Sequence, residues 1–554
     1  SPYWETQNWA DSTKSNYIHN QNRAIYSYLG ITNDITSSFN AFSNANVGTL
    51  LGNPTDITVN GATVSGVDKV INFIRGADVL DEDEDNDTIE NRAVITGDIL
   101  HSEPAVVNYN NGAFTGSGIF YGSNDGMLHA VRDSDGTEMW GFIPPDLLPR
   151  LKDILEGSSH PYYVDSSPKV FITGNHNSVV DIGEQAILIF GERSGGSNYW
   201  ALDITDPNAP TVLWSIAPSV GLNLGETWSA PVFTRVKTSD NDLTGMDVMI
   251  VGGGYSADNS AGALVAVVDV LTGSVVKIFQ GFDIDYSIPS TVVAIDLDSN
   301  GFADKVYVGD MGGQMLRIGR FTEPDGATPL DFPETNENIT DWNASVLFNT
   351  DDTRKIFYPP SVTLERGFDL VFFGTGDRND ACNPVTSDRM YAVLDDHSDF
   401  IADDSYLVDI TDPATSPPTF TNDRGYYLDL GPGEKVLAEG VVFNKVYYIS
   451  TFDPNTSDPC KPGGISRLYA FEYKTGVAMI DFDGDGQNDR SIEIGGGIPS
   501  KPVMIIPQEG PAKLLISVGS TMADTGSEAV SAGIVAIDPL LPNRNFYYLW
   551  WQDI

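Results

Sequence analysis

Long apolar runs and basic residues are scarce in this chain of 554 residues. No apolar run reaches about 18 residues, so we predict no membrane-spanning helix. Ser1 is followed by polar and aromatic residues in place of a signal peptide, so we expect a processed or truncated chain. Lys and Arg number 31 against 77 Asp and Glu, which gives a net charge of −46. Such a surface repels phosphates and suits a cation-rich medium outside the cell, so we expect no nucleic acid partner.

Signatures of common hydrolases are also missing. The 6 histidines show no His-Glu-x-x-His spacing, and GERSGG (191–196) lacks the nucleophile-elbow pattern. We interpret His101 and His129, which flank predicted strands, as hydrogen-bonded structural residues. We therefore predict that the protein is not an enzyme, although its many aspartates leave a glycosidase open.

Acidic residues recur in a loop pattern typical of calcium sites. DFDGDGQNDR (481–490) has acids at positions 1, 3, 5 and 9 of such a loop and Gly486 at position 6, where a sharp turn is needed. Carboxylates this close repel one another unless a cation lies between them. A closing acid at position 9 instead of 12 fits a loop that leads into a strand. The expected ligands are Asp481, Asp483, Asp485, Gln487 (main-chain carbonyl) and Asp489.

The same pattern occurs in DLDSNGFAD (296–304), which the predicted strand KVYVG follows. Its expected ligands are Asp296, Asp298, Asn300, Phe302 (main-chain carbonyl) and Asp304. We call residues 296–304 the first loop and residues 481–489 the second loop. The second has one more carboxylate, and this predicts tighter binding there, because ligand charge tunes affinity. We expect one or two calcium ions, and the alternative is a pair of solvated turns.

A third acidic run, DEDEDND (81–87), has Asn86 where the pattern requires Gly. We interpret it as a solvated, mobile loop, with a calcium role as the alternative.

An apolar strand with a small central residue recurs along the chain at intervals of roughly 50 to 80 residues. The copies are GMLHAVRD (126–133), NYWALDI (198–204), ALVAVVD (263–269), GQMLRIG (313–319), RMYAVLD (389–395), RLYAFEY (467–473) and GIVAIDP (533–539). Helical periodicity is weak outside 15–30 and 144–155. We therefore predict an all-β fold, a β-propeller of about seven blades over 95–554, after a short irregular or partly helical lead-in segment, 1–94.

The two cysteines occupy equivalent positions in successive repeats. Cys382 and Cys460 each lie nine residues before a repeat tyrosine, Tyr391 and Tyr469. If neighbouring blades bring these loops together, a disulfide forms and indicates an oxidising compartment. Two free thiols remain the alternative.

Eight phrases, in order, resemble one known family. They are GDILHSEPAVV (97–107), FYGSNDGMLHAVRDSDGTEMWGFIP (120–144), YWALDITDP (199–207), TWSAPVF (227–233), DLDSNGFADKVYVGDMGGQMLRI (296–318), FGTGD (373–377), SDPCKPGGISRLYAFEY (457–473) and GGGIPSKPV (495–503). From about residue 65 to the end, the chain resembles the C-terminal propeller of the PilY/PilC-type type IV pilus tip adhesins.

This resemblance implies a modified seven-bladed propeller at a pilus tip, exported through the periplasm, that supports pilus biogenesis, surface adhesion and twitching motility. It implies that calcium in the first loop opposes retraction and that its release permits retraction. Minor pilins are the implied partners, and a host or abiotic surface would be bound through an N-terminal adhesive part that is missing here.

Two other classes stay open. Propellers of the quinone-dependent dehydrogenases use phrases close to VRDSDGTEMW (131–140) and VVDVLTGSVV (267–276), which we interpret as blade-packing turns. Those enzymes carry a vicinal Cys-Cys pair, whereas the cysteines here are far apart in sequence. In a purely structural calcium propeller, the ions would only hold loops in place.

Overall fold

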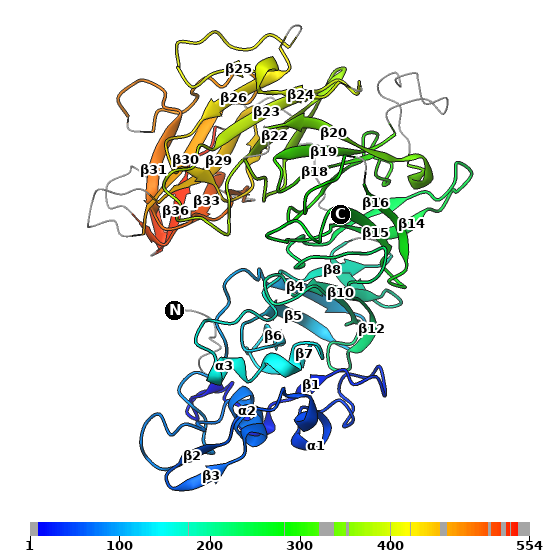
Figure 1. Ribbon diagram of the computed structural model, residues 1–554, viewed down its shortest axis with the longest axis vertical. Helices are drawn as coiled ribbons and strands as arrows, with labels where there is room; N and C mark the ends of the chain where they lie inside the picture. The colour runs from blue at the N-terminus through cyan, green and yellow to red at the C-terminus, as the bar shows by residue number, and fades with distance from the viewer. Residues whose placement is uncertain are drawn as a thin grey trace. The chain divides into compact units, whose positions relative to one another are not determined.

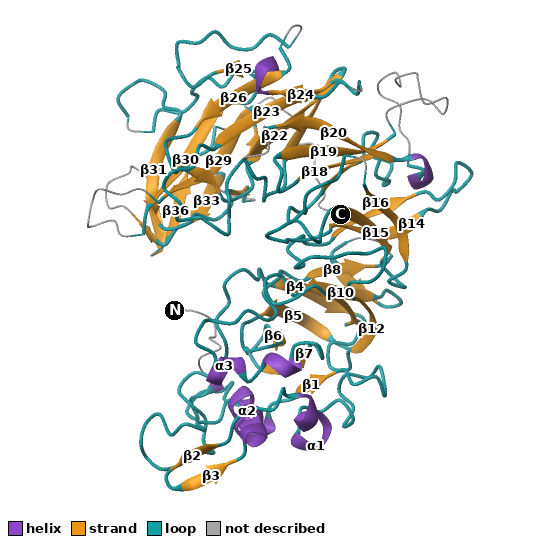
Figure 2. Cartoon of the chain, in the orientation of Figure 1, coloured by secondary structure: helices purple, strands orange, loops and turns teal. Residues whose placement is uncertain are grey.

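The computed structural model is built largely from β-strands (Figures 1 and 2). It describes residues 9–174, 177–281, 283–320, 337–350, 354–398, 400–420, 423–454, 463–482, 484–507, 511–521, 528–531 and 533–540. Within these ranges, no helix has the length and apolar character that crossing a bilayer requires.

Seven sheets of four to six strands make up the described fold, together with one short hairpin, β2 (Ile57–Val59) and β3 (Ala62–Val64). Every recurring phrase forms an interior strand of a different sheet. These strands are β6 (Leu128–Arg132), β11 (Tyr199–Asp203), β15 (Leu264–Asp269), β19 (Gln314–Gly319), β23 (Arg389–Asp395), β30 (Ile465–Glu472) and β36 (Ile534–Ile537). Most of the residues in these strands are buried, and most of them are apolar. Their assembly into seven blades of one propeller stays a prediction.

In the first two sheets, the phrase strand has antiparallel neighbours on both sides. The first has the order β1 (Ile25–Ser27), β7 (Glu138–Ile143), β6, β5 (Thr115–Gly122), β4 (Ala105–Asn110), β9 (Val179–Asp181). The second is β12 (Thr211–Ile216), β11, β10 (Ala186–Gly191), β8 (Lys169–Ile172). The third is β13 (Val232–Val236), β14 (Met246–Gly252), β15, β16 (Val275–Gln280).

Four more sheets complete the described chain. The fourth is β17 (Val293–Ile295), β18 (Lys305–Gly309), β19, β20 (Asn343–Asn349), β24 (Ala402–Asp403), and the fifth is β21 (Ser361–Glu365), β22 (Phe368–Gly374), β23, β26 (Gly425–Asp429), β25 (Val408–Asp409). The sixth is β27 (Lys435–Val436), β29 (Val446–Asp453), β30, β31 (Ser491–Gly496), β34 (Ser520–Thr521), with β28 (Val441–Phe443) also paired to β29. The seventh is β32 (Val503–Ile505), β33 (Lys513–Ser517), β36, β35 (Glu528–Ser531).

Contacts divide the chain into two compact units. One comprises Ser1–Phe233, Asp247–Ser256 and Ala266–Val276, and the other comprises Thr234–Met246, Ala257–Val265 and Lys277–Ile554. Both acidic loops lie in the second unit.

Helices are few and short in the part of the chain that the structure describes. They are α1 (Asn44–Val47), α2 (Gly66–Arg75), α3 (Asp153–Glu156) and the 3-10 turns η2 (Asn20–Asn22), η3 (Gly48–Leu50), η4 (Leu148–Arg150), η5 (Ile339–Asp341) and η6 (Asp404–Tyr406). Helix α2 begins where the Ser65 side chain accepts from the Asp68 N–H, and it ends at Gly76, whose φ is +104°.

The helical pattern at 15–30 was a wrong indication. That segment contains only the turn η2, followed by β1, which pairs in parallel with β7 and places Ile25 opposite Gly141. Pairing with an existing sheet edge and burial of Ile25 outweigh the local helical period in this segment. The pattern at 144–155 is helical only in η4 and α3.

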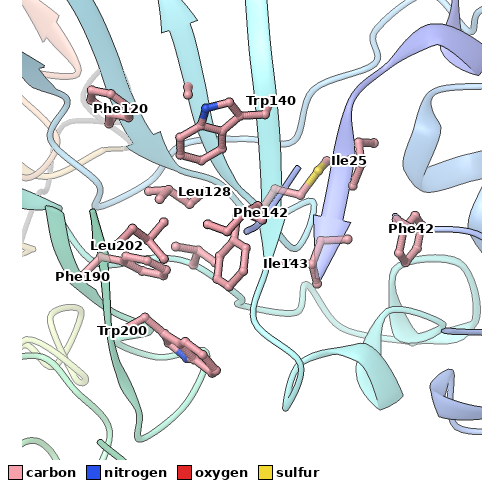
Figure 3. Close-up of a cluster of buried hydrophobic side chains, with 14 of the residues drawn as sticks. Ile25, Phe42, Phe120, Leu128, Trp140, Phe142, Ile143, Phe190, Trp200 and Leu202 are labelled. Carbon is pink, nitrogen blue, oxygen red and sulfur yellow. The ribbon is translucent and has the colours of Figure 1, made fainter. Parts of the chain in front are cut away.

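Aromatic side chains fill the core of the first unit (Figure 3). Phe142 packs edge-on against Phe190 and Trp200, at ring-centroid distances of 6.3 and 5.8 Å. Trp140 Nε1 donates to the Pro207 carbonyl of the next sheet at 2.8 Å, and Trp214 Nε1 donates to Val270 at 2.9 Å. Both tryptophans thus join one sheet to a turn of the following sheet. Trp140 of VRDSDGTEMW and Val270 of VVDVLTGSVV thus both take part in contacts between sheets.

Candidate metal centre

The first loop connects the antiparallel strands β17 and β18. Its backbone N–H groups point toward its acids: Leu297 donates to Asp304 Oδ2 and Gly301 donates to Asp296 Oδ2, each at 2.7 Å. Gly301 has φ +88°, the left-handed conformation that a tight turn at position 6 needs. Asp296, Asp298 and Asp304 each bring an oxygen within 4.8 Å of the others. The loop therefore gathers three carboxylates at one point.

Asp304 is the most unusual of these acids, because its side chain is only 4% exposed. Its Oδ1 atom has no hydrogen-bond partner. Burial, assisted by the negative charges of Glu337, Asp298 and Asp296, raises the pKa of Asp304 to about 7, against the hydrogen bond from Leu297. A buried carboxylate oxygen without a partner costs free energy that a cation would offset. An all-oxygen donor set of this kind fits a hard cation such as calcium.

Asn300, at position 5, has its carbonyl oxygen turned into the loop. Its Oδ1 accepts from the Phe302 N–H at 2.9 Å, and its Nδ2 donates to Asp298 Oδ2 at 3.0 Å. The Phe302 ring is buried and has no atom that could bind a metal, so only the main-chain carbonyl of this residue can serve as a ligand. Three of the five residues singled out by the sequence, Asp296, Asp298 and Asp304, are thus brought together, with Asn300 hydrogen-bonded to Asp298; the role of all five as ligands stays a prediction.

The second loop repeats this hydrogen-bond pattern. Phe482 donates to Asp489 Oδ2 at 3.1 Å, Gly486 donates to Asp481 Oδ2 at 2.9 Å, and the Gln487 N–H donates to Asp485 Oδ1 at 2.8 Å. Gly486 also has φ +88°. Asp483 lies outside the described residues. Most of this loop is exposed, and Asp489 is half-buried where Asp304 is buried.

The acidic run 81–87 shares two features with the first loop. The N–H of Asn86, whose φ is +71°, donates to Asp81 Oδ1 at 2.9 Å, so Asn takes the place of the glycine. Asp81, Asp83 and Asp85 each offer an oxygen within 4.8 Å of the others. The closing acid is absent, because Ile89 stands at position 9.

Two residues that the sequence did not single out lie beside the first loop. Glu337 Oε1 accepts from Asn300 Nδ2 at 2.7 Å, and Glu337 Oε2 lies 3.3 Å from Lys237 Nζ. They are 37 and 63 residues from Asn300 in sequence, and no local motif marks them.

A buried group of potential metal ligands, Asp369, Asp395 and His397, lies in the second unit. Lys305 Nζ contacts Asp369 Oδ2, and Arg317 Nη1 lies 2.6 Å from Asp395 Oδ1. Two cationic side chains of the chain itself thus balance the two carboxylates. We therefore assign this group to an internal ion-pair network.

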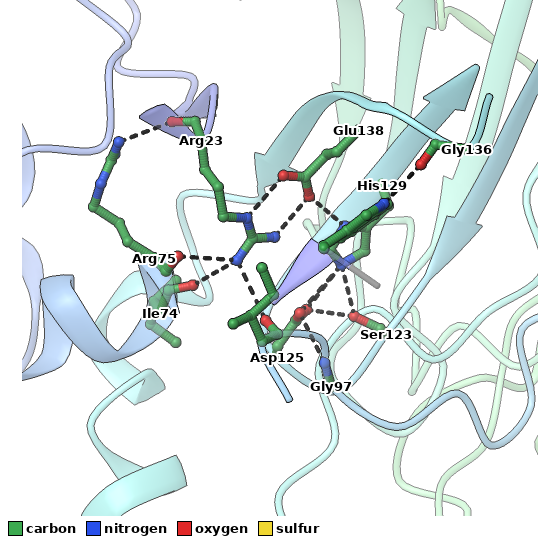
Figure 4. Close-up of polar contacts among 11 residues, drawn as sticks. Arg23, Ile74, Arg75, Gly97, Ser123, Asp125, His129, Gly136 and Glu138 are labelled. Atoms are coloured by element: carbon green, nitrogen blue, oxygen red, sulfur yellow. Dashed lines mark hydrogen bonds and ion pairs between the residues drawn. The ribbon is translucent and has the colours of Figure 1, made fainter. Parts of the chain in front are cut away.

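The first unit contains a buried network that resembles a catalytic triad (Figure 4). His129 Nε2 lies 3.0 Å from Ser123 Oγ, and His129 Nδ1 lies 3.0 Å from Glu138 Oε1. Burial alone would lower the pKa of His129, but Asp125 and Glu138 outweigh it and raise this pKa to about 9. A histidine that keeps its proton at neutral pH cannot act as a general base. All these side chains are buried, and Arg23 Nε binds Glu138 Oε2 at 2.7 Å, so the network has a structural role.

His101 and the two cysteines contribute little to the candidate site. His101 Nδ1 lies 2.7 Å from Asp165 Oδ2, in agreement with a structural role. Cys382 is exposed, whereas Cys460 lies outside the described residues, so the disulfide stays a prediction.

Seven sheets built around one recurring strand, and an oxygen-lined loop between two strands, define a repetitive β-sheet protein with a candidate cation site. The sequence model of the family described as "PilY1 beta-propeller domain" matches residues 108–402, more than half of the chain. The chain therefore belongs to the PilY1 β-propeller domain family.

Individual relatives agree with this assignment. The chain is 27% identical over 500 residues to "Type IV pilus biogenesis factor PilY1" of Pseudomonas aeruginosa strain PAO1, covering 75% of this chain and 41% of the relative. It is 30% identical over 310 residues to the factor of the same name from strain UCBPP-PA14, covering 50% and 24%. The crystal structure of the Pseudomonas aeruginosa PilY1 C-terminal domain superposes with a TM-score of 0.54 at 21% identity, covering 72% of this chain and 90% of that one. The chain thus spans less than half the length of these curated relatives and shares the fold of the C-terminal domain.

Proposed function

We propose that this chain is the calcium-binding β-propeller of a type IV pilus tip protein that supports pilus biogenesis. The relatives are named type IV pilus biogenesis factors, which supports a pilus-associated, surface-exposed location after export through the periplasm. Minor pilins are the proposed partners of the propeller. Adhesion to a host or abiotic surface would involve an N-terminal part of the whole protein.

We also propose that calcium in the first loop controls pilus extension and retraction, and hence twitching motility. The observation that carries this proposal is the buried, unpartnered oxygen of Asp304 among three carboxylates. Without an ion, these carboxylates repel one another and loosen the connection between β17 and β18. A bound ion holds the two strands together and stabilises the sheet by about 3 kcal/mol at a hundredfold excess over Kd. A change of that size can shift a docking surface between two populations.

Calcium titration by calorimetry, with thermal melting alongside, tests this proposal on the chain and on Asp304→Ala and Asp489→Ala. We expect two sites, with the one lost in Asp304→Ala having a Kd of about 10⁻⁴ to 10⁻³ M, within the range of extracellular calcium. Twitching by cells whose whole protein carries Asp304→Ala should then no longer respond to calcium. Binding too tight to release would reduce the ions to structural supports. No binding at all would remove the proposal and return attention to the quinone-dependent enzymes.

A further inference from the structure

Two oppositely charged side chains from distant parts of the second unit meet beside the first loop. Glu337 Oε1 accepts from Asn300 Nδ2 at 2.7 Å. Lys237 Nζ lies 3.3 Å from Glu337 Oε2 and 4.9 Å from the centroid of the Phe302 ring. Glu337 thus contacts position 5 of the loop, and Lys237 contacts position 7.

Main-chain hydrogen bonds hold together the two segments that carry these side chains. The Lys237 N–H donates to the Glu337 carbonyl at 2.7 Å, and the Ile339 N–H donates to the Lys237 carbonyl at 2.9 Å. The loop is attached to the same segment, since the Ala303 N–H donates to the Arg235 carbonyl at 2.9 Å. The pair therefore belongs to the local fold of the site and is not a chance surface contact.

The two charges act on a cation in opposite directions. Glu337 adds a fourth carboxylate next to the three of the loop, and it shares the Asn300 amide nitrogen with Asp298 while the Asn300 carbonyl oxygen accepts from the Phe302 N–H. Lys237 carries a positive charge that repels a divalent ion and partly neutralises Glu337. Both side chains are largely buried, at 12% and 23% exposure, which reduces screening by solvent.

We propose that Glu337 and Lys237 are an opposed pair of positioning residues that sets the calcium affinity of the first loop, with Glu337 strengthening binding and Lys237 weakening it. This inference rests on the proposed calcium function and extends it to residues outside the loop. It also means that the number of carboxylates no longer separates the two loops, because the first loop has as many nearby carboxylates as the second. Lys237 then becomes the feature that keeps the first site weak enough to release its ion.

The test uses the full chain with Asp489→Asn, so that the second loop no longer contributes. Calcium itself is the probe, titrated by calorimetry. Glu337→Gln keeps the acceptor for Asn300 but removes the charge, and it should raise Kd about three- to tenfold. Lys237→Met keeps the aliphatic stem against Phe302 and should lower Kd about two- to fivefold. Asp341→Asn, a neighbouring acid in η5, is the matched control and should leave Kd within about twofold.

Salt dependence separates a charge effect from a structural one. Both changes in Kd should shrink as potassium chloride rises from about 0.02 to about 0.5 M. Opposite signs for the two variants would support the pair. Weakening by both variants, or no change in either, would overturn it. Absence of calcium binding in the native chain would instead refute the proposed function, so the two failures are distinguishable.

Discussion

Calcium binding to the first loop should release a proton from Asp304. Burial and the neighbouring acids raise the pKa of this carboxyl to about 7 in the absence of an ion. At pH 7, about half of the ion-free molecules therefore carry a proton that calcium must displace. We expect about 0.5 protons released per ion at pH 7, about 0.9 at pH 6 and almost none at pH 9. The apparent affinity should fall about twofold at pH 7 and about tenfold at pH 6, relative to pH 9.

A rise in pH strengthens calcium binding, but it destabilises the fold of the ion-free protein. The folded-state pKa of Asp304 is raised above its usual value of 3.8, so protonation stabilises the fold and this contribution is lost as pH rises toward 7. The melting temperature in a chelator should therefore fall between about pH 4 and 7, as far as this group contributes. Saturating calcium should reverse this trend, because the ion replaces the proton.

Calorimetry in two buffers with different ionisation enthalpies measures the released protons directly. The chain should carry Asp489→Asn, so that the first loop alone binds. The observed enthalpy should differ at pH 7 between two buffers that do not bind calcium, such as PIPES and Tris, and the difference between two such buffers should vanish at pH 9. Asp304→Asn, which imitates the protonated acid, is the control and should bind weakly without proton release. Equal enthalpies in both buffers at pH 7 would mean that Asp304 is already ionised, which would refute the raised pKa of this carboxyl.

Three other predictions concern single positions. Gly301→Ala should lower the stability of the loop by about 1 kcal/mol and weaken calcium binding, because φ is +88° there; melting and titration check this. Arg23→Met leaves buried Glu138 without its guanidinium partner and should lower the free energy of unfolding by about 3–5 kcal/mol in urea. Thiol titration of the unfolded chain should find no free thiol before reduction and two afterwards if Cys382 and Cys460 are bridged, and two in both conditions if they are not.

Much of the fold could be predicted from the amino-acid composition of the strands. The phrases around Leu128, Val265 and Val393 lie inside sheets, where a strand is buried on both faces and most side chains are apolar; His129 and Asp395 are buried exceptions that are paired with charged side chains. The acidic loops were equally readable, because a tight turn with acids at alternate positions is a local property of the chain.

Features that depend on contacts between residues far apart in the sequence could not be predicted from such local patterns. The segment around Ile25 looked helical, yet it pairs with β7, more than a hundred residues later in the chain. Glu337 and Lys237 approach the first loop only because main-chain bonds hold their segments together, so no spacing in the sequence reveals them. The burial of Asp304 likewise depends on the surrounding fold and not on its place in a motif.

That burial is also what distinguishes two loops that are nearly identical in local structure. Both loops have the same backbone hydrogen bonds to the acids at positions 1 and 9. The second loop is mostly exposed, so water solvates its carboxylates when no ion is bound. In the first loop, Asp304 has an oxygen that no group satisfies, and loss of an ion leaves this cost in the sheet itself. Loss of the ion from the first loop therefore leaves a more strained ion-free fold than loss from the second loop, although ions bound with equal affinity would stabilise the fold equally. This difference places the proposed calcium response in the first loop.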